Sequence, residues 1–157
     1  MSKLYNSITK DQLDKLDCAR KTGLVIGFTN GCFDLLHDGH RHLLDIAKNF
    51  CDYLVVGLNS DSSVKKIKGP KRPIENVDIR IRKLMDNQNV DLVIVFNELT
   101  PEFLIKQVLP EILIKGADYR GKHVVGERIV KENGGRVELI ELLPEYSTTK
   151  IIKERNL

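Results

Sequence analysis

The sequence predicts an α/β protein built on one doubly wound, mainly parallel sheet of five strands. Three observations support this expectation. Short apolar segments alternate with amphipathic segments along the whole chain. The apolar segments are continuous, as is typical of parallel strands that are covered on both faces. The length of 157 residues suits about one domain, and the chain has no internal repeat or low-complexity tract.

Five apolar runs are the expected strands, and they cover residues 24–28, 53–58, 92–96, 112–115 and 137–140. Segments with apolar residues at helical spacing lie between them. The expected helices are residues 9–20, 38–49, a short helix through Val64 and Ile67, residues 78–88, a helix from Thr100 to Pro110, residues 125–132 and a final helix from Ser147. We interpret residues 1–22 as an N-terminal helical extension and residues 23–157 as the single main domain.

Capping residues and apolar faces support the individual helices. Thr9 is a possible N-cap of the first helix, which Gly23 ends. Thr100 is expected to cap the helix that has Pro101 at its first position. The apolar faces expected for these two helices consist of Leu13, Leu16, Phe103, Leu104 and Val108.

Composition excludes several classes of protein. The net charge of +3 is too small to predict nucleic-acid binding and favours a mixed surface with a locally basic pocket. Cys18, Cys32 and Cys51 form no CxxC pair and no zinc spacing, so we expect free thiols in a reducing cytoplasm. Without a secretory leader or an apolar run of membrane-spanning length, the chain is expected to be cytoplasmic and to have no membrane partner.

The segment 29–40 carries the main functional signal. It leads from the first strand, through a loop with Gly31 and Gly39, to a helix start with His37 and His40. A helix N-terminus has unpaired N–H groups and a positive dipole end, so it suits a phosphate. Two histidines three residues apart are expected on one helix face, where both can reach one phosphate. A metal pair is less favoured, because no third His or Cys has suitable ligand spacing.

Four features are expected to follow strand ends and to meet at one edge of the sheet: the His37/His40 pair, a basic loop at 65–72, residues 116–119 and residues 147–149. The basic loop is either a solvated turn or an electropositive lid over an anionic substrate, and its position favours the lid. The hydroxyl triplet 147–149 suits either simple N-capping or a polyphosphate tail, and the residues leave both open.

These motifs resemble the cytidylyltransferase-like nucleotidyltransferases. The resemblance rests on T-N-G-C-F-D-x-x-H-x-G-H at 29–40, R-x-x-x-L at 80–84 and S-T-T at 147–149. One branch, the adenylyltransferase domain that makes ADP-heptose, is more similar still. The segments that carry this closer similarity are 59–64, 68–73, 115–119, 133–135 and 146–149, within a similarity that covers residues 22–153.

The resemblance implies a Rossmann-like fold of the HxGH nucleotidyltransferase type and a specific reaction. ATP and D-glycero-β-D-manno-heptose 1-phosphate would give ADP-heptose and pyrophosphate, for lipopolysaccharide core biosynthesis. It implies in-line attack on the α-phosphorus with no covalent enzyme intermediate. It also implies Mg²⁺ bound mainly through substrate phosphates, with no protein metal site. The implied partners are ATP, a sugar 1-phosphate and further copies of the chain, in a dimer or higher homo-oligomer.

The same resemblance assigns roles to single residues. The implied catalytic residues are His37, His40, Lys68 and Arg80. The implied nucleotide-binding residues are Thr29, Asn30, Gly31, Cys32, Phe33, Gly39, His40, Gly116, Asp118, Tyr119, Ser147, Thr148 and Thr149. The implied sugar-phosphate-binding residues are Asp34, Asn59, Asp61, Lys68, Lys71 and Arg72.

The sequence departs from its relatives in two places. Glu145 stands where they commonly have glycine, so the loop before the hydroxyl triplet is expected to differ from theirs. The segment 86–89 is more polar than usual, which affects the expected dimer packing rather than the chemistry. Relatives often fuse this domain to a sugar kinase, and here we expect a separate kinase to supply the sugar phosphate.

Two other functions remain open at this stage. The first is a cytidylyltransferase acting on glycerol 3-phosphate or another polyol phosphate. Such relatives carry a tryptophan after the acidic pair, whereas this chain has Asp118–Tyr119 and no tryptophan. The second is a non-catalytic nucleotide-binding or RNA-associated module. The histidine pair, Arg80 and the hydroxyl triplet argue against it.

Overall fold

The sheet consists of five strands that all run parallel. The computed structural model describes residues 8–117, 121–141 and 151–153. The strands are β1 (Ile26–Gly31), β2 (Tyr53–Asn59), β3 (Leu92–Phe96), β4 (Ile112–Gly116) and β5 (Arg136–Ile140). Their order is β3-β2-β1-β4-β5, and each neighbouring pair is parallel. The predicted five-stranded parallel sheet is therefore confirmed.

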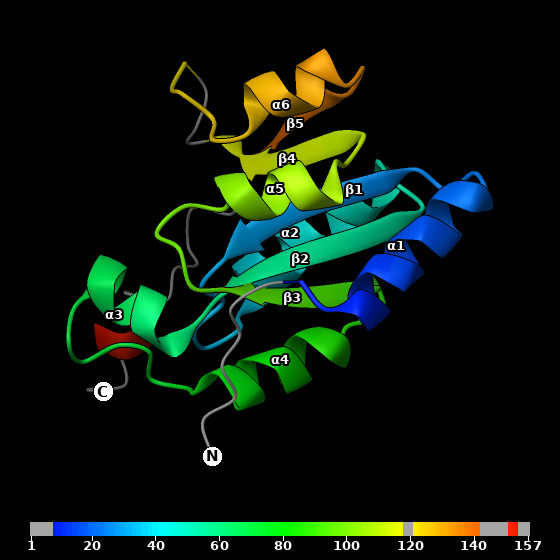
Figure 1. Ribbon diagram of the computed structural model, residues 1–157. Coiled ribbons are helices and arrows are strands. Elements are labelled where there is room, and N and C mark those ends of the chain that lie inside the picture. Colours follow the sequence, from blue (N-terminus) through cyan, green and yellow to red (C-terminus); the bar gives the residue numbers. More distant parts are fainter. Residues whose placement is uncertain (1–7, 118–120, 142–150, 154–157) are drawn as a thin grey trace.

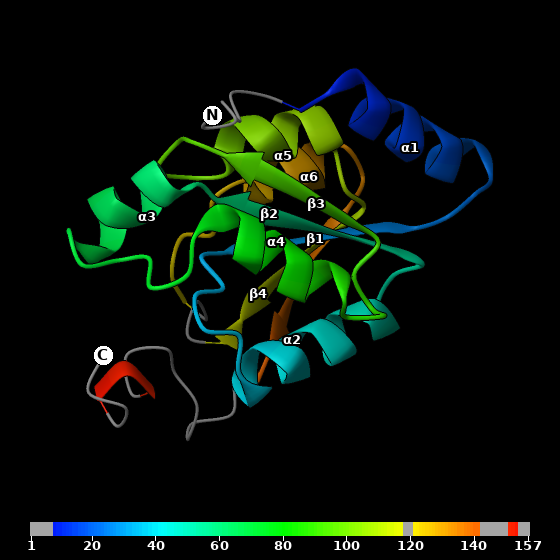
Figure 2. The ribbon, with the colours of Figure 1, turned by 90° about the horizontal axis from the view of Figure 1, so that it is seen from below.

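Helices cover both faces of this sheet (Figures 1 and 2). They are α1 (Lys10–Lys21), α2 (Asp38–Asn49), α3 (Asp61–Lys68), α4 (Val77–Met85), α5 (Glu102–Val108) and α6 (Glu127–Glu132). Figure 2 shows α1, α5 and α6 on one face and α2 and α4 on the other, while α3 lies beyond the carboxyl end of β2. This is the predicted doubly wound arrangement.

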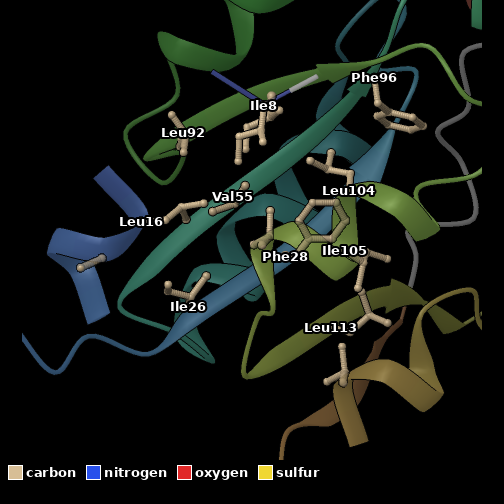
Figure 3. Packing of buried hydrophobic residues seen from close by; sticks show 14 of the residues in the cluster. Ile8, Leu16, Ile26, Phe28, Val55, Leu92, Phe96, Leu104, Ile105 and Leu113 are labelled. Atoms are coloured by element: carbon tan, nitrogen blue, oxygen red, sulfur yellow. The ribbon is translucent and has the colours of Figure 1, made fainter. Parts of the chain in front are cut away.

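Apolar side chains fill the layer between the sheet and α1, α5 and α6 (Figure 3). Leu16 of α1 and Ile105 of α5 are completely buried there, against Phe28 and Leu113 of the sheet. Burying each such side chain contributes about 1.5–3 kcal/mol. On the opposite face, Leu44 and Ala47 of α2 and Leu84 of α4 pack against alternate residues of the same strands. The two layers fix the strands whose carboxyl ends carry the candidate site.

Several predicted element boundaries are wrong. β1 continues through Gly31, so Thr29, Asn30 and Gly31 lie in a strand rather than in a loop, because they pair with β2 as far as Leu58. The basic segment is a loop only from Gly69 onward. Its first lysines form the last turn of α3, which the Ser60 side chain caps.

The helix faces and caps also differ in detail from the expectation. Leu13 is 38% exposed and Phe103 is 53% exposed, because α1 and α5 bury Ala19 and Ile105 instead. Thr100 is not the cap of α5. Pro101 occupies the N-cap position, and no side-chain hydrogen bond caps this helix. The Thr9 cap is confirmed, since its side chain accepts a hydrogen bond from the Gln12 amide in a reciprocal capping box.

The strand order reverses between β1 and β4. β1 pairs with β2 along its whole length, from Ile26 to Gly31. Its pairing with β4 covers only Gly27 with Ile112 and Phe28 with Leu113. The carboxyl halves of β1 and β4 therefore separate at the reversal point, which is where open α/β sheets bind ligands.

Gly27 provides a test of how tightly the core of this sheet is packed. A Cβ at this position would lie 2.6 Å from Cys51 Sγ and 2.9 Å from Cys51 Cβ. Gly27→Ala should therefore lower the free energy of unfolding by about 1–3 kcal/mol in urea titrations. In a Cys51→Ala background the loss should be smaller, because the thiol is then absent. Equal losses in both backgrounds would contradict the close packing described.

Candidate functional site

Two histidines cap helix α2 and each other. His37 is the N-cap residue, and its Nδ1 accepts from the amides of Gly39 at 3.1 Å and His40 at 3.4 Å. His40 reciprocates, since its Nδ1 accepts from the His37 amide at 3.2 Å. The two rings stack with their centroids 3.7 Å apart. His37 thus precedes the helix instead of lying on its face, yet the imidazoles are adjacent, as predicted.

The capping bonds determine which nitrogen of each ring carries a hydrogen. A backbone N–H that donates to Nδ1 requires a lone pair there, so the neutral ring carries its hydrogen on Nε2. Burial lowers the pKa of His40 to about 3, and the adjacent His37 and Arg41 act in the same direction. Burial also lowers the pKa of His37. At neutral pH the pair is uncharged and can donate hydrogen bonds to an anion through Nε2.

The loop before α2 holds two non-glycine residues in the left-handed region, Phe33 with φ 48° and Leu35 with φ 54°. Such conformations cost about 1–3 kcal/mol each and persist only where packing enforces them. Phe33 is buried, and its ring centroid lies 5.2 Å from that of His40. A Cβ on Gly31 would come within 3.0 Å of the Phe33 ring. The absence of this carbon lets Phe33 pack beside the histidines.

A buried carboxylate fastens the loop to the segment that follows α3. Asp34, which is 1% exposed, accepts from Arg72 Nε at 2.7 Å and from the amides of Ile74 at 2.8 Å and Glu75 at 3.0 Å. Burial alone would raise the pKa of Asp34, but the two amides and the guanidinium lower it overall. The geometry gives Asp34 and Arg72 a structural role, and their predicted contact with a sugar phosphate stays a prediction.

Arg80 is a buried cation that joins the ends of two strands. Its Nη1 donates to the carbonyl oxygens of Cys32 at 2.8 Å and Asn59 at 2.7 Å. Its Nη2 donates to Asp61 Oδ1 at 2.7 Å, and its Nε donates to the Glu75 carbonyl at 3.0 Å. Four of its five N–H groups are thus engaged within the protein. Direct contact of Arg80 with substrate stays a prediction.

Three cations act on the Cys32 thiol at the end of β1. Burial raises the pKa of Cys32, while the charges of Lys68, Arg80 and Arg72 oppose this rise. The three cations therefore create a positive field at this thiol, beside the histidine pair. Lys68 and Lys71 are exposed at the end of α3 and in the loop after it. The basic segment is thus located beside the site, and its action as a lid stays a prediction.

Sequence reasoning missed one cation of the site. Lys115, at the end of β4, is 7% exposed, and its Nζ donates to Asn30 Oδ1 of β1. Burial lowers the pKa of Lys115 to about 8. The available signal was a single lysine ending the apolar run Ile112–Ile114, because strand ends at this edge carry ligand-binding residues.

The remaining predicted residues divide into those that the structure places and those that it does not. Thr29, Gly31 and Asn59 lie at the ends of β1 and β2, and Gly116 ends β4. Gly39 lies in the first turn of α2. Five predicted residues lie outside the described part of the chain: Asp118, Tyr119, Ser147, Thr148 and Thr149.

The described residues nearest in sequence to the hydroxyl triplet, Glu141 and the turn at 151–153, lie at the same edge as the histidines. His42 Nε2 is 3.2 Å from the Glu141 carbonyl oxygen, so the end of β5 adjoins α2. The helical turn at 151–153, red in Figures 1 and 2, lies on the side of the sheet where the strands end. The convergence of the triplet with the histidine pair remains a prediction.

Two further features of the described residues bear on function. Among the described residues, no group of three or more His, Cys, Asp or Glu side chains is placed to hold a metal ion. Within the same part of the chain, no helix is both long enough and apolar enough to cross a bilayer. The polar groups gathered at the site are imidazoles, a guanidinium, an ammonium and amides, a set that suits phosphate rather than a cation.

Comparison with known proteins agrees with this geometry. A family model described as cytidylyltransferase-like matches residues 28–154. The Bifunctional protein HldE of Rhodopseudomonas palustris (strain BisB5) is 49% identical over 135 residues, which cover 86% of this chain and 28% of the relative. The protein of the same name from Acidiphilium cryptum (strain JF-5) is 53% identical over 133 residues, covering 85% of this chain and 27% of the relative. The chain thus spans less than a third of the length of these relatives.

One solved structure is similar as well. It is the crystal structure of the lipopolysaccharide core biosynthesis protein from Thermoplasma volcanium GSS1. The match has a TM-score of 0.64 and 26% identity, and it covers 80% of this chain and all of the other.

The histidine pair should make stability depend on pH. Unfolded histidine has a pKa near 6.5, whereas the folded pKa of His40 is about 3, so the unfolded chain binds the extra proton between these values. The free energy of unfolding should therefore fall as the pH drops from 6.5 to 5, by at most about 1.4 kcal/mol per pH unit for each histidine that takes up a proton. Urea titrations across this range measure the slope.

His40→Gln should flatten this slope, because the amide oxygen can still cap but does not titrate in this range. His123→Gln is the matched control, because His123 is exposed and lies outside the cap. It should leave the slope unchanged. A slope that survives His40→Gln in full would contradict the assigned pKa shift.

The buried contacts of Asp34 predict that two aspartates differ strongly in their contribution to the free energy of unfolding. Asp34→Asn should cost about 3 kcal/mol, because it leaves the Arg72 guanidinium unpaired in a buried setting. Asp38→Asn should cost less than about 1 kcal/mol, since Asp38 pairs with Arg41 at the exposed surface. Chemical denaturation measures both. Similar losses for the two variants would show that the Asp34 contacts contribute little.

Proposed function

Because this chain belongs to the cytidylyltransferase-like family of nucleotidyltransferases, we propose that it transfers the adenylyl group of ATP to a sugar 1-phosphate. The proposed acceptor is D-glycero-β-D-manno-heptose 1-phosphate, and the products are ADP-heptose and pyrophosphate. The motif similarity described above supports this choice of substrates. A similar solved structure, that of the lipopolysaccharide core biosynthesis protein, points to the same pathway.

The observation that carries the proposal is the reciprocal cap of His37 and His40. It holds two neutral imidazoles at a helix N-terminus, with Nδ1 occupied and the hydrogen on Nε2. Such rings can donate hydrogen bonds to phosphate oxygens without taking up a proton. The partial positive charge of the N-terminus of α2 adds to this attraction.

The reaction requires positioning and charge stabilisation more than bond-making groups from the protein. A phosphate oxygen of the sugar phosphate attacks the α-phosphorus of ATP in line. The bond from this phosphorus to the bridging oxygen breaks, and pyrophosphate leaves with the bonding electrons. The histidine pair donates to oxygens that gain charge in the transition state. Lys68, one of the cations that act on the Cys32 thiol, attracts the anionic substrates.

Magnesium enters the proposal only through the substrate. The described donor set suits phosphate, so Mg²⁺ would be held by phosphate oxygens and water. When bound there, the ion neutralises triphosphate charge. The chain itself contributes N–H donors to the phosphate oxygens.

Pyrophosphate release tests the proposal directly. Incubation of the protein with ATP, Mg²⁺ and heptose 1-phosphate should release pyrophosphate, with ATP preferred over CTP. His37→Ala should lower kcat by about 10²–10³, the loss typical of one transition-state donor. His42→Gln, in the same helix but outside the cap, should keep wild-type activity.

Each alternative has its own outcome in this assay. A preference for CTP with glycerol 3-phosphate would replace the adenylyltransferase with a polyol-phosphate cytidylyltransferase. Release no higher than that of His37→Ala, with every nucleotide and sugar phosphate offered, would reject the enzymatic proposal.

A further inference from the structure

Lys115 and Asn30 face each other at the carboxyl ends of β4 and β1, beyond the point where the pairing of these two strands stops. We propose that Lys115 is a positioning residue that orients the Asn30 amide to donate a hydrogen bond to the base or ribose of the bound nucleotide. This inference rests on the proposed nucleotide-binding function. It adds a residue that the motif similarity did not assign, and a role for Asn30 that is specific to one of the two substrates.

The contact determines which way the amide faces. An ammonium group has three N–H donors and no acceptor, so the Asn30 atom that faces Lys115 must be the oxygen. Nδ2 and its two hydrogens therefore point away from Lys115. Without the ammonium, oxygen and nitrogen of an asparagine can exchange places by rotation, and a ligand would meet either a donor or an acceptor.

The Asn30 amide nitrogen is available to a ligand. No hydrogen bond of this nitrogen to the described residues occurs in the structure. In that part of the chain, the buried side-chain polar atom without a hydrogen-bond partner is Glu75 Oε1. Asn30 is half-buried, and its Nδ2 is not one of these buried atoms. The position thus offers a donor that no group in the described part of the chain accepts.

The location separates this donor from the phosphate-binding groups. Side chains alternate along β1, and Asn30 lies on the α5 face, since its Cβ and Leu104 Cδ2 both approach Gly57. The histidine cap belongs to α2, on the other face. A ligand that spans the carboxyl end of β1 would meet the N–H donors of the histidine cap at one end and the Asn30 amide at the other.

This pair of environments fits a nucleoside triphosphate. Its phosphates need cations and N–H groups, while its base and ribose present uncharged nitrogen and oxygen acceptors. The reversal point between β1 and β4 is also where open α/β sheets bind such ligands. Burying an ammonium group costs free energy unless it has a polar partner. The Asn30 oxygen is such a partner for Lys115, and the same contact orients the Asn30 amide.

Two variants separate orientation from structural support. Lys115→Met removes the ammonium at similar length and should raise the Kd for ATP about tenfold, the value of one positioned hydrogen bond. Asn30→Asp keeps the contact with Lys115, now as an ion pair, but replaces the donor by an acceptor. It should bind ATP at least as weakly as Lys115→Met while unfolding at the same or higher urea concentration than the wild type. Lys106→Met, an exposed lysine of α5, is the matched control and should change neither quantity.

Calorimetric titration with ATP alone and with CTP alone gives the Kd values, and steady-state kinetics give KM for each substrate. The KM for ATP should rise in both variants, while the KM for the sugar phosphate stays within about twofold. Wild-type ATP affinity in Asn30→Asp, or a loss confined to the sugar phosphate, would overturn the inference. Nucleotide binding that shifts as expected without any pyrophosphate release would overturn the proposed reaction only. Absence of nucleotide binding by the wild type would overturn both.

Discussion

The buried guanidinium of Arg80 is the contact on which the geometry of the site depends. Arg80 donates hydrogen bonds to the carbonyl oxygens of Cys32, directly after β1, and of Asn59, the last residue of β2. Buried carbonyl groups without partners would destabilise these strand ends. The same side chain reaches Asp61 at the start of α3, so one cation aligns two strands and a helix. Asp34 then connects the next loop to this unit.

Local backbone structure and the chemistry of the site are closely linked in this protein. The start of α2 is capped by imidazoles, where serine, threonine, aspartate or asparagine would be usual. The cap therefore selects the tautomer of each ring, and the rings in turn hold the first turn of the helix. Any change that frays this turn also changes the donor atoms that face a phosphate. The left-handed residues Phe33 and Leu35 show that the fold tolerates strain to keep this turn in place.

Much of the fold could be predicted from the sequence, because continuous apolar runs identify β2, β3 and β4 without knowledge of their neighbours. The end of β1 could not, since Asn30 and Gly31 have low strand propensity and only pairing with β2 makes them a strand. The cation-rich segment 65–73, which Gly69 and two prolines interrupt, suggested a loop, although its first lysines are good helix formers and lie in α3. The histidine pair was found because its partners are local. The contacts of Asp34, Arg80 and Lys115 join segments far apart in sequence, so no local pattern contained them.

The central position of β1 has a consequence for how the chain folds during synthesis. One edge of β1 pairs with β2, which follows closely in the sequence. Its other edge stays unpaired until β4 has been synthesised. Phe28 has to meet Leu113, and the residues between them take on the order of ten seconds to be translated. During that interval the nascent half-sheet presents an unpaired apolar strand edge, the kind of surface that aggregates or recruits chaperones. The strand order that separates the ends of β1 and β4 thus also leaves the unfinished chain prone to aggregation on the ribosome.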